Sequence, residues 1–154
     1  MRIFIVDGKE RTFADVICEN SAKFDSLLVA SYGFGVRQVE KLLSVFREVV
    51  LVADESHSVL NRKAFESVLS KSEHNEKFSF LPSRTHAKLA LIDNETIIVT
   101  SANLSSNRKI ELYLIGSAKE VDGIDELKKF FGDPDEVFGK TVGDGLDDID
   151  WEKL

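Results

Sequence analysis

The strongest constraint on the fold is a pair of short apolar segments separated by four polar residues. Residues 86–92 are mostly apolar, residues 97–100 read Ile-Ile-Val-Thr, and Asp93-Asn94-Glu95-Thr96 lies between them. β-Branched residues on both sides of an Asp-Asn pair are typical of a β-hairpin with a tight turn. The sequence therefore predicts two consecutive antiparallel strands around this turn.

The predicted hairpin carries four polar side chains that could bind one ligand. With a two-residue loop at positions 94–95, His86 faces Asn103, and Lys88 faces Ser101. Side chains alternate across a strand, so we expect these four to project from one face. Directly opposed side chains lie close enough to share one small anion.

These residue types suit the chemistry of a phosphodiester. A neutral imidazole such as that of His86 can attack phosphorus and split one difficult displacement into two easier steps. The Lys88 ammonium supplies fixed positive charge where the phosphoryl oxygens become more negative. The Ser101 hydroxyl and the Asn103 amide add directional hydrogen-bond donors. We therefore expect a phosphoryl-transfer site on this hairpin.

The pattern resembles the signature of the phospholipase D superfamily, His-x-Lys-x4-Asp followed downstream by Gly-Ser-x-Asn. His86, Lys88 and Asp93 match the first part position for position. The resemblance includes Asp93 among the site residues. Its place beside the turn, on the face opposite His86, predicts a structural role as a hydrogen-bond acceptor.

The second part of the signature is matched with one departure. Ser101 and Asn103 stand at the expected positions, whereas Thr100 replaces the usual glycine and adds a β-branched side chain. Glu111, eight residues past Asn103, resembles the downstream acid that orients the nucleophilic histidine in small nucleases of the family. The resemblance implies a catalytic or substrate-binding role for all of these except Thr100.

The surrounding sequence predicts alternating strands and helices. Apolar runs and helical spacing of apolar residues give a strand over 26–34 that ends in a glycine turn, a helix over 36–47, a strand over 48–53, a helix over 61–71 and a strand over 78–81. The resemblance, which spans roughly residues 24–132, implies an α/β fold, a phospholipase D-like αβ sandwich with a mixed central sheet flanked by helices. We expect a single domain over 1–132 and an acidic, flexible tail over 133–154.

The chain contains one motif, whereas the two-step reaction of the family needs two histidines. The resemblance implies a homodimer in which one His86 is the nucleophile and the other is the general acid. The remaining histidines, His57 and His74, are expected in surface turns. The reaction implied by the resemblance needs no metal or other cofactor, and the sequence has neither a cysteine pair nor a His-Glu-x-x-His motif.

Composition indicates a globular domain without a membrane segment. The length of 154 residues and a hydrophobic content of 43% allow a full core. The single cysteine, Cys18, excludes an internal disulfide framework and is expected in the core of an N-terminal helix. The first residues are too briefly apolar for a signal peptide, and no run approaches a membrane span. We therefore expect a cytoplasmic protein.

The net charge of −7 is concentrated near the C-terminus. Residues 133–154 hold eight acidic residues against two lysines, which leaves residues 1–132 almost neutral. Around the motif the local charge is positive, and Arg108 and Lys109 are candidate substrate contacts. For the tail, a solvated terminus is the simpler interpretation; the alternatives are a peptide that docks on a protein partner through Trp151 or one that covers the basic site.

Three functions remain open from the sequence. The first is a metal-independent endonuclease that cleaves DNA or RNA through a phosphohistidine. The second is a hydrolase of phospholipids or another small phosphodiester. The third is a dimeric module that binds nucleic acid or a protein partner and has little catalytic turnover. Thr100 in place of glycine and the negative net charge keep this alternative open.

Overall fold

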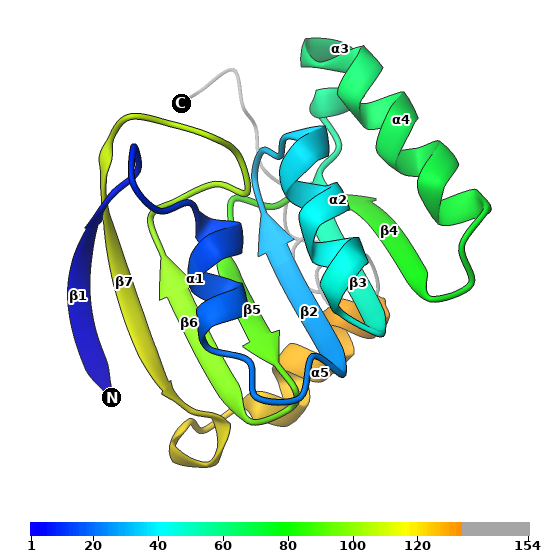
Figure 1. Cartoon of the computed structure of the whole chain (residues 1–154). Helices are drawn as coiled ribbons and strands as arrows, with labels where there is room; N and C mark the ends of the chain where they lie inside the picture. Colours follow the sequence, from blue (N-terminus) through cyan, green and yellow to red (C-terminus); the bar gives the residue numbers. More distant parts are fainter. Residues whose placement is uncertain (134–154) are drawn as a thin grey trace, which may run out of the picture. The chain divides into compact units, whose positions relative to one another are not determined.

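The computed structural model describes residues 1–133, of which residues 1–122 form an α/β fold with one seven-stranded sheet. Figure 1 shows the sheet with helices packed against it. The predicted tail over 133–154, with Trp151, lies almost wholly outside the described residues. The chain divides into two compact units, Met1–Asp122 and a second that begins at Gly123.

The strands and helices follow one another in the first unit with short connections. In chain order they are β1 (Arg2–Asp7), α1 (Phe13–Glu19), β2 (Ser26–Ser31), α2 (Val36–Val45), β3 (Glu48–Asp54), α3 (His57–Leu60), α4 (Arg62–Glu73), β4 (Phe78–Ser83), β5 (Leu89–Ile92), β6 (Thr96–Thr100), β7 (Ile110–Ser117) and a short 3₁₀-helix (Ala118–Glu120). Each strand and helix predicted between residues 26 and 81 is confirmed, with its ends shifted by a few residues.

The sheet is mixed, in the strand order β1-β7-β6-β5-β2-β3-β4. Strands β2, β3 and β4 are parallel, which follows from their helical crossovers. Strand β2 pairs antiparallel with β5 on its other side, and β5, β6, β7 and β1 continue antiparallel. The predicted mixed sheet flanked by helices is therefore confirmed.

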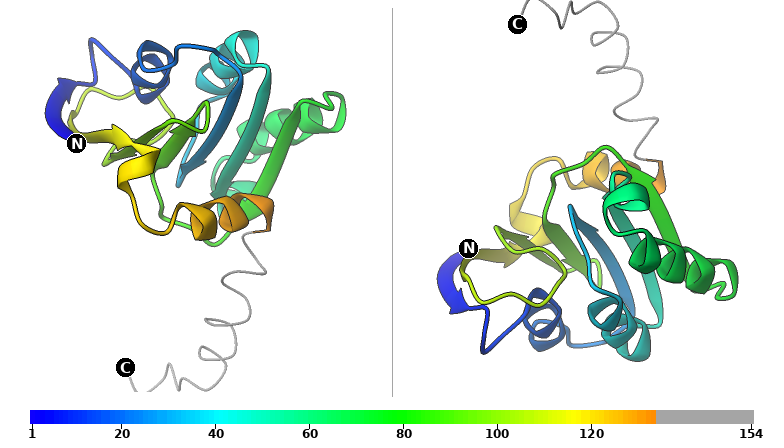
Figure 2. Two further views of the ribbon diagram at one scale, coloured as in Figure 1. Left: turned by 90° about the horizontal axis from the view of Figure 1, so that it is seen from below. Right: turned by 90° about the horizontal axis from the view of Figure 1, so that it is seen from above.

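Helices α1, α2 and α4 lie on one face of the sheet (Figures 1 and 2). The core lies between them and alternate residues of the strands; its members include Val16, Ile17, Val29, Val39, Leu42, Leu51, Val68, Ile92 and Ile98. Tyr113 is 1% exposed and stacks on Phe4 at 5.5 Å between ring centroids. Burial of each large apolar side chain contributes about 2 kcal/mol. Cys18 packs at the edge of this core and is half-buried.

The second unit contains α5 (Ile124–Gly132), which begins after Gly123. Gly123 has a φ of 89°, a left-handed conformation that glycine adopts without strain. Asp125 and Glu126 lie in the first turn, where negative charge interacts favourably with the helix dipole.

The motif hairpin forms, but its register differs by one residue from the prediction. Ile92 pairs with Thr96, so the loop has three residues, Asp93–Glu95, rather than two. Asp93 and Asn94 both adopt positive φ, a conformation that short polar side chains tolerate better than most others. The predicted two-residue loop is therefore wrong. In the observed register Lys88 lies opposite Thr100, and the Thr100 amide donates to the Lys88 carbonyl at 3.1 Å. The four motif side chains therefore do not share one face of a regular hairpin.

Asp93 is buried at the turn and anchors the segment that precedes β2. Its carboxylate accepts hydrogen bonds from the Ser21 hydroxyl at 2.6 Å and from three backbone amides, those of Lys23, Asp25 and Ser26. Burial alone would raise the pKa of Asp93, but these hydrogen bonds outweigh it and hold the pKa below its usual value. Asp93 is thus a structural acceptor that joins two segments of the chain.

We predict that Asp93→Asn lowers the free energy of unfolding by about 2 kcal/mol at neutral pH, because an amide cannot accept all four bonds. A carboxylate with a lowered folded-state pKa stabilises the fold above its unfolded-state pKa, and this stabilisation is lost as the pH falls through the folded-state value. Urea unfolding at pH 7 and pH 3 should therefore show a difference between the two proteins that shrinks at acidic pH. Asp122→Asn, at an exposed acid, is the matched control; an equal effect of both substitutions would contradict the assignment.

Candidate functional site

The polar residues of the motif gather at one edge of the sheet. Strands β2, β3, β4 and β6 end at this edge, and β5 and β7 begin there (Figure 1). In open α/β sheets, loops beyond the carboxyl ends of the strands commonly form the ligand site. His86 lies in the segment between β4 and β5, and Asn103 lies in the loop between β6 and β7.

His86 is exposed, and its ring is held by an aromatic neighbour. The imidazole stacks on the Tyr32 ring with centroids 4.5 Å apart and an interplanar angle of 10°. Tyr32 directly follows β2, so the stacking fixes the histidine beside the end of a central strand. The motif did not reveal Tyr32, because the contact joins residues 54 positions apart.

A second imidazole lies behind Tyr32. The His57 ring packs edge-on against Tyr32, with centroids 5.2 Å apart, and lies tilted by 51° against Phe34 at 5.7 Å. Both ring nitrogens of His57 are buried and without a hydrogen-bond partner in the described part of the chain. The prediction that His57 lies in a surface turn is wrong, whereas His74 is exposed at the end of α4, as predicted.

Asn103 is fixed by the backbone that follows β2. Its Oδ1 accepts a hydrogen bond from the Gly33 amide at 3.0 Å and a longer one from the Ser31 hydroxyl at 3.4 Å. Because these donors define the orientation of the amide, its Nδ2 is the group left to donate to a ligand. A β-carbon at Gly33 would lie 3.3 Å from the His57 ring and 3.8 Å from Asn103 Cγ, so this tight approach favours glycine.

The two halves of the motif therefore meet at one dipeptide. Tyr32 contacts His86, and the adjacent Gly33 contacts Asn103. The glycine turn predicted after β2 thus holds both His86 and Asn103 in place. The sequence did not indicate this role.

Ser101 and Glu111 form a pair at the start of β7. The Ser101 hydroxyl donates to Glu111 Oε2 and accepts a hydrogen bond from the Leu112 amide at 3.0 Å. Glu111 is 9% exposed. Within residues 1–133 no hydrogen bond joins Glu111 to His86, so its contact with the site runs through Ser101.

Thr100, which stands where the family signature has glycine, uses its hydroxyl within the backbone. Thr100 Oγ1 donates to the Leu112 carbonyl at 2.8 Å and accepts from the Ala102 amide at 3.0 Å. These bonds turn the chain out of β6 toward Asn103. The Thr100 side chain therefore has a local structural role at the end of β6.

Lys88 brings its ammonium next to His86. Its Nζ lies 3.4 Å from the His86 carbonyl oxygen, and the side chain is half-buried. None of the ion pairs of the described chain uses Lys88. The charge of Lys88 is thus available to a ligand anion.

Asp54, at the end of β3, holds the segment that leads to His86. Its carboxylate accepts from the Ser56 amide and from the Thr85 amide, both at 3.0 Å. Burial would raise the pKa of Asp54, but the hydrogen bonds from Ser56 and Thr85, together with the nearby His86, lower it below its usual value. Asp54 therefore positions Thr85, the residue that precedes His86. In the sequence, a single aspartate at the end of a predicted strand does not indicate such a role.

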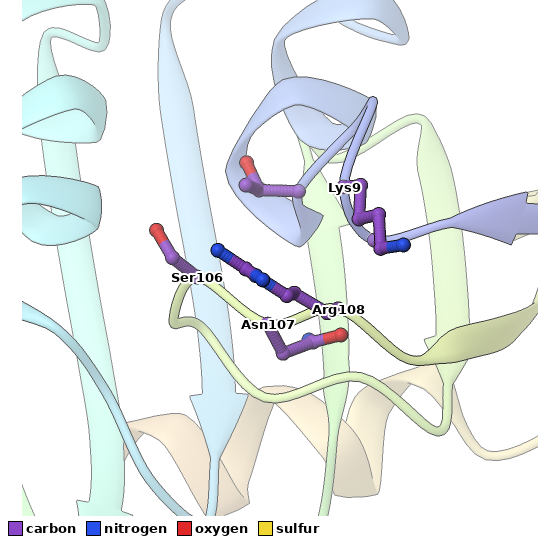
Figure 3. A pocket seen from close by; sticks show the side chains of 6 residues that line it. Lys9, Ser106, Asn107 and Arg108 are labelled. Atoms are coloured by element: carbon purple, nitrogen blue, oxygen red, sulfur yellow. The ribbon is translucent and has the colours of Figure 1, made fainter.

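Arg108 and Lys109 lie in the loop between β6 and β7. Arg108 lines a pocket of about 560 Å³, shown in Figure 3, with the other lining residues Gly8, Lys9, Thr12, Ser106 and Asn107. The Lys109 side chain is exposed, and its backbone bonds to Gly8 and to Asn107. Asp93 is not part of this edge, because β5 runs from His86 toward the opposite end of the sheet.

Neither a metal cluster nor a membrane-spanning helix is found among the described residues. Within residues 1–133 there is no group of three or more His, Cys, Asp or Glu side chains arranged to hold a metal ion. No helix in the same residues has the length and apolar character needed to cross a membrane.

The chain has a phospholipase D-like fold, with the motif residues His86, Lys88 and Asn103 at one edge of its sheet. Among solved structures, the chain is similar to NucT from Helicobacter pylori, with a TM-score of 0.61 and 15% identity over 85% of this chain and 93% of that one. It is also similar to Nuc from Salmonella typhimurium, a phospholipase D family member, with a TM-score of 0.63 and 14% identity over 86% of this chain and 92% of that one.

A third similar structure is TrmBL2, described as an archaeal chromatin protein with a novel mode of DNA binding. Its TM-score is 0.56 at 13% identity, over 88% of this chain and 52% of that one. No family model and no curated protein sequence matches the chain. The resemblance suggested by the motif is thus supported at the level of the fold.

We predict that Tyr32→Leu releases the His86 ring without unfolding the protein. The His86 ring protons, shielded by the stacked Tyr32 ring, should move downfield in histidine-selective NMR spectra, and the stability loss should be about 1 kcal/mol. Tyr32→Phe keeps the ring and should leave the His86 signals in place, and the exposed His74 serves as an internal reference. His86 signals that are the same in Tyr32→Leu and in the unmodified protein would show that the stacking does not hold in solution.

Proposed function

We propose that this chain is a metal-independent phosphodiesterase that cleaves DNA or RNA by a two-step phosphohistidine mechanism at a homodimer interface. The observation that carries the proposal is the meeting of the two motif halves on Tyr32-Gly33, where an exposed imidazole, an unpaired ammonium and a free amide donor occur together. The similarity to Nuc, a phospholipase D family member, and to NucT supports the same reaction class.

In the first step, a nitrogen of His86 attacks phosphorus, and the bond from phosphorus to the leaving oxygen breaks. His86 of the partner subunit gives its proton to that oxygen. Lys88 and the Asn103 amide stabilise the negative charge on the phosphoryl oxygens. In the second step, water attacks phosphorus and loses its proton to the partner's His86, the phosphorus–nitrogen bond breaks, and His86 is restored.

Ser101 and Glu111 complete the proposed site. The Ser101 hydroxyl is bound to the buried Glu111 carboxylate. We assign Glu111 a positioning role that acts through Ser101; for Ser101 to bind the phosphoryl group, its one proton turns from Glu111 to a phosphoryl oxygen when the substrate enters. Arg108 and Lys109 extend the positive surface along the same loop, where a polyanionic strand would lie.

A homodimer follows from the number of histidines that the reaction needs. His57 lies near His86, but its nitrogens are buried and its ring is behind Tyr32, so it has no access to a leaving group. A second copy of His86, brought by a two-fold axis, supplies the acid instead. Closed two-fold assembly is the commonest form of oligomer.

A DNA-binding module with little turnover is the second candidate. The similarity to TrmBL2, described as a DNA-binding chromatin protein, favours it, as does the departure from the family signature at Thr100. Binding that is unaccompanied by cleavage would select this candidate. A hydrolase of lipids or small phosphodiesters has no specific observation in its favour.

We predict cleavage of single-stranded DNA or RNA in the presence of EDTA and its loss, by at least about a thousandfold, in His86→Ala, because the nucleophile is removed. Mass spectrometry of the quenched reaction should find a phosphoryl group on His86. His74→Ala, at an exposed histidine, is the matched control and should retain activity. Cleavage that persists in His86→Ala, or that EDTA abolishes, would contradict the mechanism.

We also predict that His86→Ala subunits inactivate the unmodified subunits with which they assemble. After co-refolding of equal amounts, only about one quarter of the dimers hold two unmodified subunits, so activity should fall to about a quarter of that of the same total amount of unmodified protein. Sedimentation equilibrium should report a dimer. A fall to one half, or a monomer that is fully active, would show that each chain works alone.

A further inference from the structure

The pocket beside Arg108 combines the side chains that bind a phosphate. Lys9 and Arg108 bring two cations, Thr12 and Ser106 bring hydroxyls, and Asn107 brings an amide. In Figure 3 the Arg108 side chain extends from its loop toward Ser106, whereas the Lys9 ammonium points toward the opposite side, so Lys9 reaches a ligand beside Arg108 by turning its flexible side chain. The volume of about 560 Å³ admits a group of nucleotide size, since small-molecule sites commonly span about 300–1,000 Å³.

The two cations are not neutralised by neighbouring acids. No ion pair within the described residues 1–133 involves Lys9 or Arg108. Among the nearby acids, Asp7 accepts from the Lys9 backbone amide, and Asp15 is bound to Lys41 and to the Thr12 amide. Glu10, next to Lys9 in the sequence, forms no ion pair with either cation within the same described residues. The positive charge in the pocket therefore remains for an external anion.

The pocket is preformed, because hydrogen bonds within the protein hold its lining segments in place. Gly8 donates to the Lys109 carbonyl at 2.9 Å, and a β-carbon at Gly8 would come within 2.8 Å of the same carbonyl oxygen, so this close approach of two backbone segments favours glycine. Asn107 Oδ1 in turn accepts from the Lys109 amide at 2.8 Å. Gln38 donates to the Ser106 hydroxyl at 3.3 Å, which ties the same loop to α2.

The pocket lies on the loop that also carries the candidate catalytic donors. Ser106 is three residues beyond Asn103, and three residues span at most about 11 Å of extended chain. A nucleic-acid strand advances about 3.4 Å per nucleotide in a duplex and can extend further when single. The pocket is thus within a few nucleotides of the phosphate that His86 attacks.

We propose that this pocket is a second phosphate site, which binds the backbone phosphate of a nucleotide near the cleaved bond in a nucleic-acid strand. The inference rests on the proposed function and extends it, because it selects polynucleotides over small phosphodiesters. A dinucleotide has one phosphodiester and fills only the site at His86. A longer strand fills both, so the second site gives an advantage that grows with strand length.

The test compares kcat/KM for a dinucleotide with that for an oligonucleotide of about ten nucleotides, over a range of salt concentrations. Lys9→Ala and Arg108→Gln should each reduce the preference for the longer strand at least about tenfold, as expected for the loss of one charged hydrogen bond. The salt dependence of oligonucleotide binding should become shallower by about 0.7 in log–log slope, the value for one phosphate contact of a single strand. Lys63→Ala, at an exposed lysine of α4, is the control for loss of charge alone and should keep the full preference.

An unchanged length preference in Lys9→Ala and Arg108→Gln would overturn the second site, as would an equal loss from Lys63→Ala. If the unmodified protein cleaves neither substrate, the proposed function fails, and the pocket is judged separately from equilibrium binding of the oligonucleotide by fluorescence anisotropy. Weaker binding and a shallower salt slope in the two pocket variants would then support the second site, and unchanged binding would overturn it.

Discussion

The site depends on the hydrogen bonds of one buried hydroxyl, that of Ser31 at the end of β2. Its one proton is donated chiefly to the Gly33 carbonyl and is shared with Asn103 Oδ1 at 3.4 Å, and its oxygen accepts from the Leu104 amide at 2.8 Å. A buried hydroxyl with both donor and acceptor capacity satisfied contributes to stability and fixes its neighbours in one geometry. In this way a single serine closes the turn after β2 and ties to it the loop that carries the motif asparagine.

The sequence predicted the sheet and the motif well, for reasons that are local. Apolar runs broken by turn residues located β2, β3 and β4, and helical spacing located α2 and α4. The hairpin was also recognised, but its register was not, because the loop length depends on the backbone angles of Asp93 and Asn94. Those angles are selected by hydrogen bonds to residues 21–26, which lie far away in the sequence.

The candidate site was predicted only in part, since its supporting residues have no pattern of their own. Tyr32, Asp54 and His57 follow or border strands and look ordinary in the sequence. Their roles come from the strand order, which brings the ends of β2 and β3 next to the segment before β5. The role proposed for Lys9 has the same origin: Lys9 lies in the turn after β1 and lines the pocket with Arg108 because β1 pairs with β7. A motif identifies the reacting groups, whereas the tertiary fold decides what holds them.

The pairing of β2 with β5 has a consequence for folding. Leu27 pairs with Ile92, and Ala30 pairs with Leu89, so the contact closes a chain segment of about sixty residues that contains two complete strand–helix units. Contacts between distant residues form slowly, because the entropy of closing the segment opposes them. A partly folded chain can therefore hold β2, β3 and β4 in native order while Tyr32 and His86 are still apart. Formation of the Tyr32–His86 contact would report that β2 has paired with β5, whereas helical content alone would not.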